Sequence, residues 1–309
     1  MTSVELVNFL SSDLLRLPGV LYKPQRPTKK VAIWLHGMGD NGIFYNAATI
    51  NELGDSLANQ DISLFAFNNR GAHLSKSLRI LNDDLPIDEQ HIQAGTYYEL
   101  IKDCVLDIDG ALELLKDKGF SEFYLIGIST GANKICSYHA LAKNNPFSKY
   151  VLASPGDDTG LHFNELGEKK YYQAINDAKS YIEKGKPLHT MPIKSGMNPF
   201  SAQSAMDNLN PEGDYNTFPY YEATKERLGK KPLFKELSTF DKPFLTILGE
   251  QDEWLEFIGG SKTALSLLKQ YTPQEIYKIS DYKIIPNADH SFQDQEHEFA
   301  ETVAKWLAR

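Results

Sequence analysis

The sequence has few of the features that define several classes of protein. Only two cysteines occur in 309 residues, Cys104 and Cys136, and neither stands in a CxxC pair. A disulfide framework and a zinc site are therefore not expected. Lysine and arginine number 32 against 41 aspartate and glutamate, so a groove that follows nucleic-acid phosphates is not expected either. No spacing of His, Cys, Asp or Glu is typical of a metal site, and we predict none.

Long apolar runs are also missing. The first 22 residues contain acidic side chains and are interrupted by Ser, Asp and Pro, which does not fit a secretory leader with a basic start and an apolar centre. No stretch approaches the length of a membrane span. Together with two free cysteines, this predicts a cytoplasmic protein without a membrane span. The sequence does not indicate an oligomeric state.

What the sequence does contain is a series of short apolar runs that each end at Gly, Asn or Asp. They span residues 31–37, 62–69, 122–129, 150–156, 243–250 and 282–290. Runs that are continuously apolar, rather than alternating, are typical of parallel strands buried on both faces. Two extended segments before them, 4–9 and 13–22, are expected to form an edge hairpin.

Segments with helical periodicity separate the runs. The clearest is 97–119, where apolar residues recur at three- and four-residue steps and Gly119 marks the end. We expect its carboxylates Asp103, Asp107 and Asp117 to face solvent. The alternation of strands and helices predicts an α/β fold with a doubly wound, mostly parallel sheet.

Residues 157–239 break this alternation. They show no buried-strand signal, are rich in tyrosine, and are too many for a structureless loop in a compact domain. We predict a helical cap over 157–239, inserted into a core formed by residues 1–156 and 240–309. Its aromatic side chains form either a pocket for an apolar or aromatic substrate group or the cap's own core.

The motif Gly127-Ile128-Ser129-Thr130-Gly131 stands where a buried strand changes into a helix. A serine hydroxyl is a weak nucleophile unless a base takes its proton, and a sharp turn with positive φ would project it into a site. The positions two before and two after must then be small, as Gly127 and Gly131 are. The Thr130 N–H, at the start of the helix, would point where negative charge develops.

Other strand ends supply the remaining groups of such a site, because ligands bind at the carboxyl ends of parallel strands. His290 follows the last strand-like run and is the preferred base. Asp252, a few residues past the preceding run, is the preferred orienting acid. Asp157 and Asp158 are the first alternatives, and Glu250 is the next.

The loop after the first buried run, residues 36–42, is rich in glycine and should face Ser129. The Met38 N–H is the best candidate for a second oxyanion donor, and Gly39 is the next. His36 is interpreted as a side chain that shapes this turn, and His73 as a possible pocket residue. Asp289 is interpreted as a turn former.

The pieces HGMGDN, GISTG, GEQDE and NADHSF, in this order, resemble the α/β-hydrolase superfamily over nearly the whole chain. The chain is most similar to esterase-like members with a helical cap, although Ile128 stands where relatives often have a polar or aromatic residue. The resemblance implies a serine hydrolase of small-molecule carboxylic esters that needs no cofactor. It further implies Ser129, Asp252 and His290 as the triad, Met38 and Thr130 as the oxyanion hole, and Gly37, Gly39 and Ile128 for substrate binding.

The same triad also serves acyltransferases and peptidases or amidases, so these stay as alternatives. A non-catalytic ligand receptor on this fold is less favoured because all three triad residue types are present. Dehalogenases and epoxide hydrolases are disfavoured, because they carry aspartate where this chain has Ser129.

Overall fold

The structure of the protein is a computed structural model that describes residues 2–44, 47–191 and 200–309. Residues 192–199 belong to the predicted cap, so that part of the prediction lies outside the described residues. The strands are β1 (Ser3–Leu10), β2 (Arg16–Lys23), β3 (Lys30–Leu35), β4 (Ser63–Phe67), β5 (Lys76–Arg79), β6 (His91–Ala94), β7 (Glu122–Ile128), β8 (Phe147–Ala153), β9 (Thr190–Met191), β10 (Phe200–Ser201), β11 (Phe244–Gly249) and β12 (Asp281–Ile285). The α-helices are α1 (Ala47–Ala58), α2 (Cys104–Asp117), α3 (Thr130–Leu141), α4 (Asp158–Leu166), α5 (Glu168–Glu183), α6 (Ala202–Leu209), α7 (Tyr220–Thr224), α8 (Ser261–Tyr271), α9 (Gln274–Tyr277) and α10 (Glu296–Leu307). Short 3₁₀ turns are η1 (Ile87–Glu89), η2 (Ile101–Asp103), η3 (Leu237–Thr239) and η4 (Glu253–Ile258).

The centre of the molecule is an eight-stranded sheet in the order β1-β2-β4-β3-β7-β8-β11-β12. The six strands from β4 to β12 in this order are parallel to one another. β1 and β2 form an antiparallel hairpin that joins the edge of β4. The predicted fold class, the apolar runs and the edge hairpin are therefore confirmed. Because the strands are parallel, the ends of β3, β7, β11 and β12 meet at one edge of the sheet.

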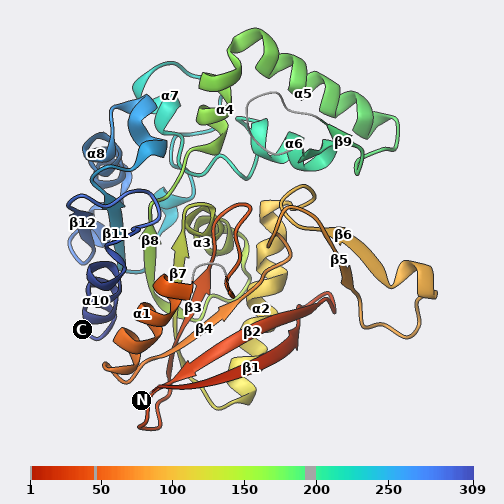
Figure 1. The fold of residues 1–309 in the computed structure, drawn as a ribbon. Helices are drawn as coiled ribbons and strands as arrows, with labels where there is room; N and C mark the ends of the chain where they lie inside the picture. The colour runs from red at the N-terminus through yellow and green to blue at the C-terminus, as the bar shows by residue number, and fades with distance from the viewer. Residues whose placement is uncertain (1, 45–46, 192–199) are drawn as a thin grey trace.

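Helices cover both faces of the sheet, as doubly wound folds require. One face packs on α1 and α10, and the Trp34 ring of β3 meets the Phe299 ring of α10 edge to face, 6.3 Å apart. The other face packs on α2, α3 and α8. Figure 1 shows α1 and α10 on the near side and α2 beyond the sheet. Burial on both faces explains why the strands read as continuous apolar runs.

The prediction that the carboxylates of 97–119 face solvent is wrong for Asp107. Its carboxylate is fully buried and accepts hydrogen bonds from the backbone N–H of Arg70 (2.7 Å), from Arg70 Nε (3.0 Å) and from Arg70 Nη2 (2.8 Å). Asp107 lies three residues after buried Cys104, at the edge of the apolar face of α2. The partner that makes its burial possible comes from a loop 37 residues earlier, which helical periodicity does not reveal.

The segment between β8 and β11 contains α4 to α7 and the β9–β10 pair, and it lies over the carboxyl edge of the sheet (Figure 1). We call its described residues, within 157–239, the cap. Most of its aromatic side chains are buried in the same core cluster as the sheet, including Phe163, Tyr171, Phe218 and Tyr220. Their ring contacts are with other aromatic residues of the cap, so for these four residues the alternative of a cap core holds.

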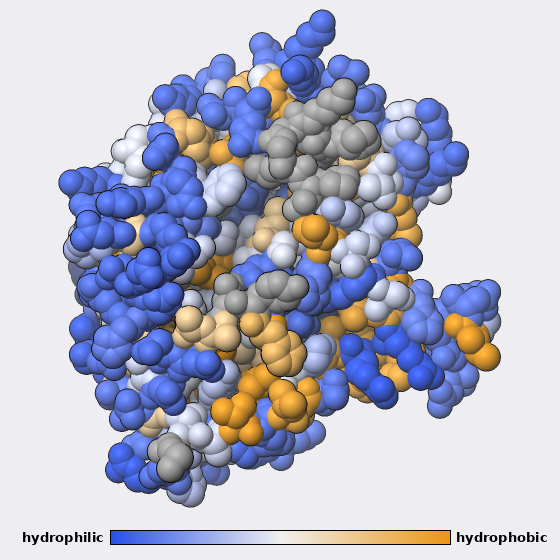
Figure 2. Space-filling model, viewed as in Figure 1, coloured by the Kyte–Doolittle hydropathy of each residue, from blue (hydrophilic) through white to orange (hydrophobic). Residues whose placement is uncertain are grey.

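The surface is largely hydrophilic on the face shown in Figure 2, with an apolar patch over β1 and β2. Val4 and Leu6 of β1 are exposed there. This patch lies at the end of the molecule opposite the cap (Figure 1). Among the helices that the structure describes, none combines the length and the apolar character that a membrane crossing requires.

Candidate active site

Ser129 occupies a strained turn between β7 and α3. Its backbone angles are φ 53° and ψ −125°, a conformation that is costly for any residue with a Cβ atom. A Cβ atom at Gly127 would lie 2.3 Å from the backbone of Gly131, and one at Gly131 would lie 2.2 Å from the Leu35 carbonyl oxygen. Both positions therefore require glycine, and the predicted turn with small residues on either side of Ser129 is confirmed.

His290 and Asp252 meet at the ends of the neighbouring strands β12 and β11. The distance from His290 Nδ1 to Asp252 Oδ1 is 2.9 Å, and the Asp252 side chain is fully buried. Asp252 Oδ1 also accepts a hydrogen bond from the Trp254 N–H, at 3.1 Å. A carboxylate accepts only, so the neutral imidazole donates from Nδ1 and leaves Nε2 free to accept a proton.

Two glutamates hold the loop that carries His290. Glu253 Oε2 accepts a hydrogen bond from the His290 N–H at 3.1 Å, and Glu250 Oε2 accepts one from the Asn287 N–H at 3.2 Å. At Gly249, a Cβ atom would lie 2.2 Å from a carbonyl of the same loop. The motif GEQDE thus supplies the partner of His290, as predicted, and also two carboxylates that hold the backbone of the His290 loop. The sequence did not indicate this second role.

Two other carboxylates considered from the sequence have structural roles. Asp157 caps α4 and accepts hydrogen bonds from the N–H groups of Gly160 and Tyr221, both at 2.7 Å. Asp289 accepts one from the Ser291 N–H at 3.0 Å, as expected of a turn former. Neither carboxylate contacts the His290 imidazole, whereas Asp252 does.

The environment of His290 raises its pKa above the ordinary value of 6.5. Burial lowers the pKa, but the hydrogen bond with Asp252 and the negative charges of Asp252, Glu253 and Asp158 raise it by more. These acidic groups favour the imidazolium form. The arrangement is therefore suited to an imidazole that receives a proton.

This shift predicts the direction of a pH profile. A general base must be neutral before it acts, so kcat/KM should increase with pH as His290 loses its proton. We expect the midpoint of this limb to lie above pH 6.5. The measurement is kcat/KM against pH for an ester without ionisable groups. A midpoint at or below the ordinary histidine value would contradict the expectation.

The glycine-rich loop after β3 lies against Ser129. A Cβ atom at Gly37 would come within 3.1 Å of Ser129 Cβ, so a larger residue would crowd Ser129. Fully buried His36 places Nδ1 2.8 Å from the Gly37 carbonyl oxygen, which supports its interpretation as a residue that shapes the turn. Burial, followed by the charge of Lys134, lowers the pKa of His36 well below its ordinary range, so it is neutral.

Thr96 makes a hydrogen bond with one of the two candidate oxyanion donors of this loop and not with the other. The Gly39 N–H donates to Thr96 Oγ1 at 2.8 Å, and Thr96 Oγ1 donates in turn to the Gly71 carbonyl at 3.1 Å. The Gly39 N–H is thus occupied. The Met38 N–H has no hydrogen-bond partner among the described residues, which favours Met38 over Gly39 as a donor to a ligand.

Replacing Thr96 by valine should loosen this loop. The change keeps the side-chain shape but leaves buried backbone groups without their partner, which costs about 1–3 kcal/mol. We expect kcat to fall about 10-fold with little change in KM, as steady-state kinetics would measure. The matched control is Thr246→Val, because the Thr246 hydroxyl in β11 is buried without a partner among the described residues. Equal kinetics for both variants would contradict the role of Thr96.

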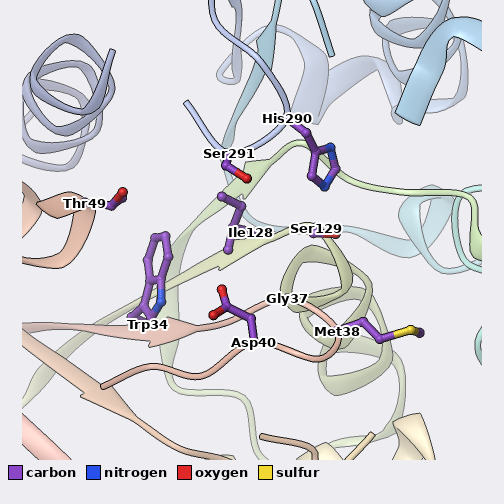
Figure 3. Close-up of a pocket in the computed structure, with 9 residues that line it drawn as sticks. All are labelled: Trp34, Gly37, Met38, Asp40, Thr49, Ile128, Ser129, His290 and Ser291. Carbon is purple, nitrogen blue, oxygen red and sulfur yellow. The ribbon is translucent and has the colours of Figure 1, made fainter. Parts of the chain in front are cut away.

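A cavity of about 300 Å³ opens beside the turn. It is lined by Trp34, Gly37, Met38, Asp40, Thr49, Ile128, Ser129, His290 and Ser291. Figure 3 shows the His290 ring directed toward the turn that carries Ser129.

The cavity brings together many of the residues singled out from the sequence. Of the sequence-predicted residues it includes Ser129, His290, Gly37, Met38 and Ile128. Asp252, Gly39 and Thr130 are not among the described residues that line it. Sequence reasoning missed Trp34, Asp40, Thr49 and Ser291. Asp40 and Ser291 lie within the quoted motifs HGMGDN and NADHSF, and Trp34 lies within the apolar run 31–37. Thr49 of α1 carries no such signal.

The described residues contain no group of three or more His, Cys, Asp or Glu side chains that could hold a metal ion. Both cysteines are buried free thiols. The site therefore consists of a serine, an imidazole–carboxylate pair and backbone donors.

Comparisons with known proteins agree with the fold. A family model described as "Protein of unknown function (DUF1749)" matches residues 95–308. No curated protein matches the sequence. Among solved structures, the α/β hydrolase GrgF from Penicillium sp. sh18 has 13% identity and a TM-score of 0.64, covering 99% of this chain and 98% of its own.

Two esterase structures are similar over comparable lengths. Est1E from Butyrivibrio proteoclasticus with bound ferulic acid has 13% identity and a TM-score of 0.62, covering 97% of each chain. The Pyrococcus furiosus esterase Pf2001 has 14% identity and a TM-score of 0.59, covering 99% of this chain and 90% of its own. At this identity the likeness is one of fold, and the fold is that of α/β-hydrolases.

Proposed function

We propose that this chain, which belongs to the DUF1749 family and has the α/β-hydrolase fold, hydrolyses carboxylic esters through an acyl-enzyme on Ser129. The observation that carries the proposal is the 2.9 Å contact of His290 Nδ1 with Asp252, in a site where His290 shares a cavity with a serine on a strained turn. Several similar structures are named as esterases, which supports esters as the substrate class.

The proposed reaction begins when His290 Nε2 takes the proton of the Ser129 hydroxyl as the oxygen attacks the ester carbonyl carbon. The N–H groups of Thr130 and Met38 donate hydrogen bonds to the oxyanion that forms. The imidazolium, stabilised by Asp252, then gives its proton to the departing alcohol. In the second half of the reaction, His290 takes a proton from water as the water oxygen attacks the carbonyl carbon of the acyl-enzyme. The bond to Ser129 then breaks, the carboxylic acid leaves, and His290 returns the proton to the Ser129 oxygen.

A fluorophosphonate probe tests the nucleophile directly. Phosphonylation needs a serine that a base activates, so the folded protein should be labelled at Ser129 and the denatured protein should not. Mass spectrometry of the labelled peptide identifies the residue. Labelling elsewhere, or none, would remove the proposal. Release of the acyl group to water rather than to an added alcohol distinguishes a hydrolase from an acyltransferase.

We also propose that the protein works in the cytoplasm. The two cysteines are buried free thiols, which supports a reducing compartment such as the cytoplasm.

A further inference from the structure

A second carboxylate faces the candidate active site without serving as the partner of His290 Nδ1. Asp158 is the first residue of α4, the helix that follows the strand β8, and β8 is a neighbour of β7. Its negative charge acts on His290, and the charge of His290 acts on Asp158 in return. Nδ1 is already bound to Asp252. Asp158 is therefore a second acidic neighbour of the imidazole, and it stands where the cap begins, at the start of α4.

Two hydroxyl groups accompany Asp158. Tyr215, 2% exposed, lies in the cap, and Thr130, 1% exposed, follows Ser129 at the start of α3. Burial raises the pKa of both Asp158 and Tyr215. A side-chain contact with the Tyr215 hydroxyl offsets part of the rise at Asp158, and one with the Thr130 hydroxyl offsets part of the rise at Tyr215. Three polar side chains from separate parts of the chain thus lie together next to Ser129.

The contacts among these three groups do not reach standard hydrogen-bond geometry within the described part of the chain. Asp158 Oδ2, Tyr215 Oη and Thr130 Oγ1 are all buried, and none makes a hydrogen bond of standard geometry there. Leaving such a group unpaired in the interior costs about 1–3 kcal/mol. Asp157, in contrast, uses both of its oxygens on backbone N–H groups. The contrast between neighbouring aspartates indicates that one is structural and the other is kept open for a ligand.

The charge of the cluster decides which ligand group it suits. Burial raises the pKa of Asp158 to about 6, so the carboxyl is ionised at neutral pH and accepts hydrogen bonds only. An anionic group would be repelled, and an apolar group would leave the carboxylate unpaired. A hydroxyl or a protonated amine donates to it, and the two hydroxyls can accept or donate to complete the shell.

We propose that Asp158, Tyr215 and Thr130 form a subsite between the cap and α3 that binds a hydrogen-bond donor of the ester substrate, a hydroxyl or an ammonium group. This inference rests on the proposed esterase function and names the substrate class of the same site. The subsite is polar, so it selects esters with a polar substituent near the scissile bond over plain alkyl esters of equal size.

Matched pairs of esters test the proposal. Methyl glycolate and methyl propanoate differ by a hydroxyl in place of a methyl group on the acyl side, and ethylene glycol monoacetate and propyl acetate differ in the same way on the alcohol side. The methyl ester of β-alanine and methyl butanoate provide the ammonium arm. For each pair, kcat/KM is measured by pH-stat at a slightly alkaline pH, and the ratio of donor ester to apolar ester is taken.

Asp158→Asn should lower that ratio about 10- to 100-fold relative to wild type in at least one pair, since a hydrogen bond to a charged group has about that effect. Comparing ratios between proteins cancels the intrinsic reactivity of each ester. Tyr215→Phe should lower the same ratio about 2- to 10-fold. The pair that responds identifies which donor is bound and on which side of the ester.

The control is Glu165→Gln, the same change of charge on exposed Glu165 of the same helix, which should leave every ratio unchanged. Thermal melts followed by circular dichroism confirm that the variants are folded. If wild type hydrolyses activated esters but all ratios survive Asp158→Asn and Tyr215→Phe, the subsite is overturned and the esterase proposal stands. If wild type neither hydrolyses esters nor reacts with a fluorophosphonate, both proposals are overturned.

Discussion

Ser129→Ala is expected to reduce kcat on an activated short-chain ester by a factor of about 10⁶. The variant lacks the oxygen that would form the acyl-enzyme, so the imidazole, the carboxylate and the backbone donors have no nucleophile to act with. Groups that work as a unit lose nearly all of their effect when one is removed. A residual rate above that in water should remain, because the oxyanion donors and the cavity still bind the ester.

The comparison is made with Ser121→Ala. Ser121 is exposed and immediately precedes β7, the strand whose opposite end carries Ser129, so the same chemical change is placed at the far end of one element. We expect wild-type kcat and KM for Ser121→Ala. Alanine at position 129 keeps the Cβ atom and the turn, so its thermal melt should stay close to wild type. Turnover by Ser129→Ala within tenfold of wild type would eliminate the acyl-enzyme route.

The arrangement of the sheet follows from features that a single sequence displays. Most of the parallel strands are nearly continuous apolar runs, and Gly, Asn or Asp follows the carboxyl end of each run. Parallel strands place those ends on one edge. That rule alone brings the residues after β3, β7, β11 and β12 together, even though Ser129 and His290 are 161 positions apart in the chain.

The turn around Ser129 is equally local. The need for glycine at Gly127 and Gly131 follows from how closely a strand and a helix approach at a sharp corner. The structure shows the expected contact with the backbone of Gly131 and one more, with the Leu35 carbonyl of the neighbouring strand. The second contact depends on which strand lies beside β7, which the motif itself does not contain.

The groups that sequence reasoning missed depend on such long-range contacts. Thr96 holds Gly39 across 57 residues, and Glu253 holds the His290 loop across 37. Asp107 is buried because Arg70 reaches it. No periodicity or motif encodes these pairs, since each partner alone is an ordinary polar residue. Asp158 is an intermediate case, because its position after a strand marked it as a candidate acid. The structure gives the His290 contact to Asp252 and the cap of α4 to Asp157, so Asp158 has neither role.

Asp252→Asn is expected to lower kcat by about 10⁴, with KM changed far less. Asparagine keeps the size of the side chain, but its amide either offers N–H groups to His290 Nδ1 or accepts from it without negative charge. In the first case the imidazole adopts the wrong tautomer, and its proton blocks Nε2. In the second, the imidazolium that forms as Ser129 is deprotonated loses its counter-charge in a site where that counter-charge is fully buried.

Two variants separate this role from the general effect of acidic neighbours. Glu253→Gln removes a charge beside His290 but keeps an oxygen that can accept from the His290 N–H, so kcat should fall less than about 10-fold. Asp158→Asn removes another charge but leaves the Nδ1 contact intact. The orienting role therefore predicts one large loss, at Asp252, and two small ones on an ester without donor groups. If the large loss occurred at Asp158 instead, the imidazole would have to turn away from the 2.9 Å contact during catalysis, and Asp158 would be the orienting acid.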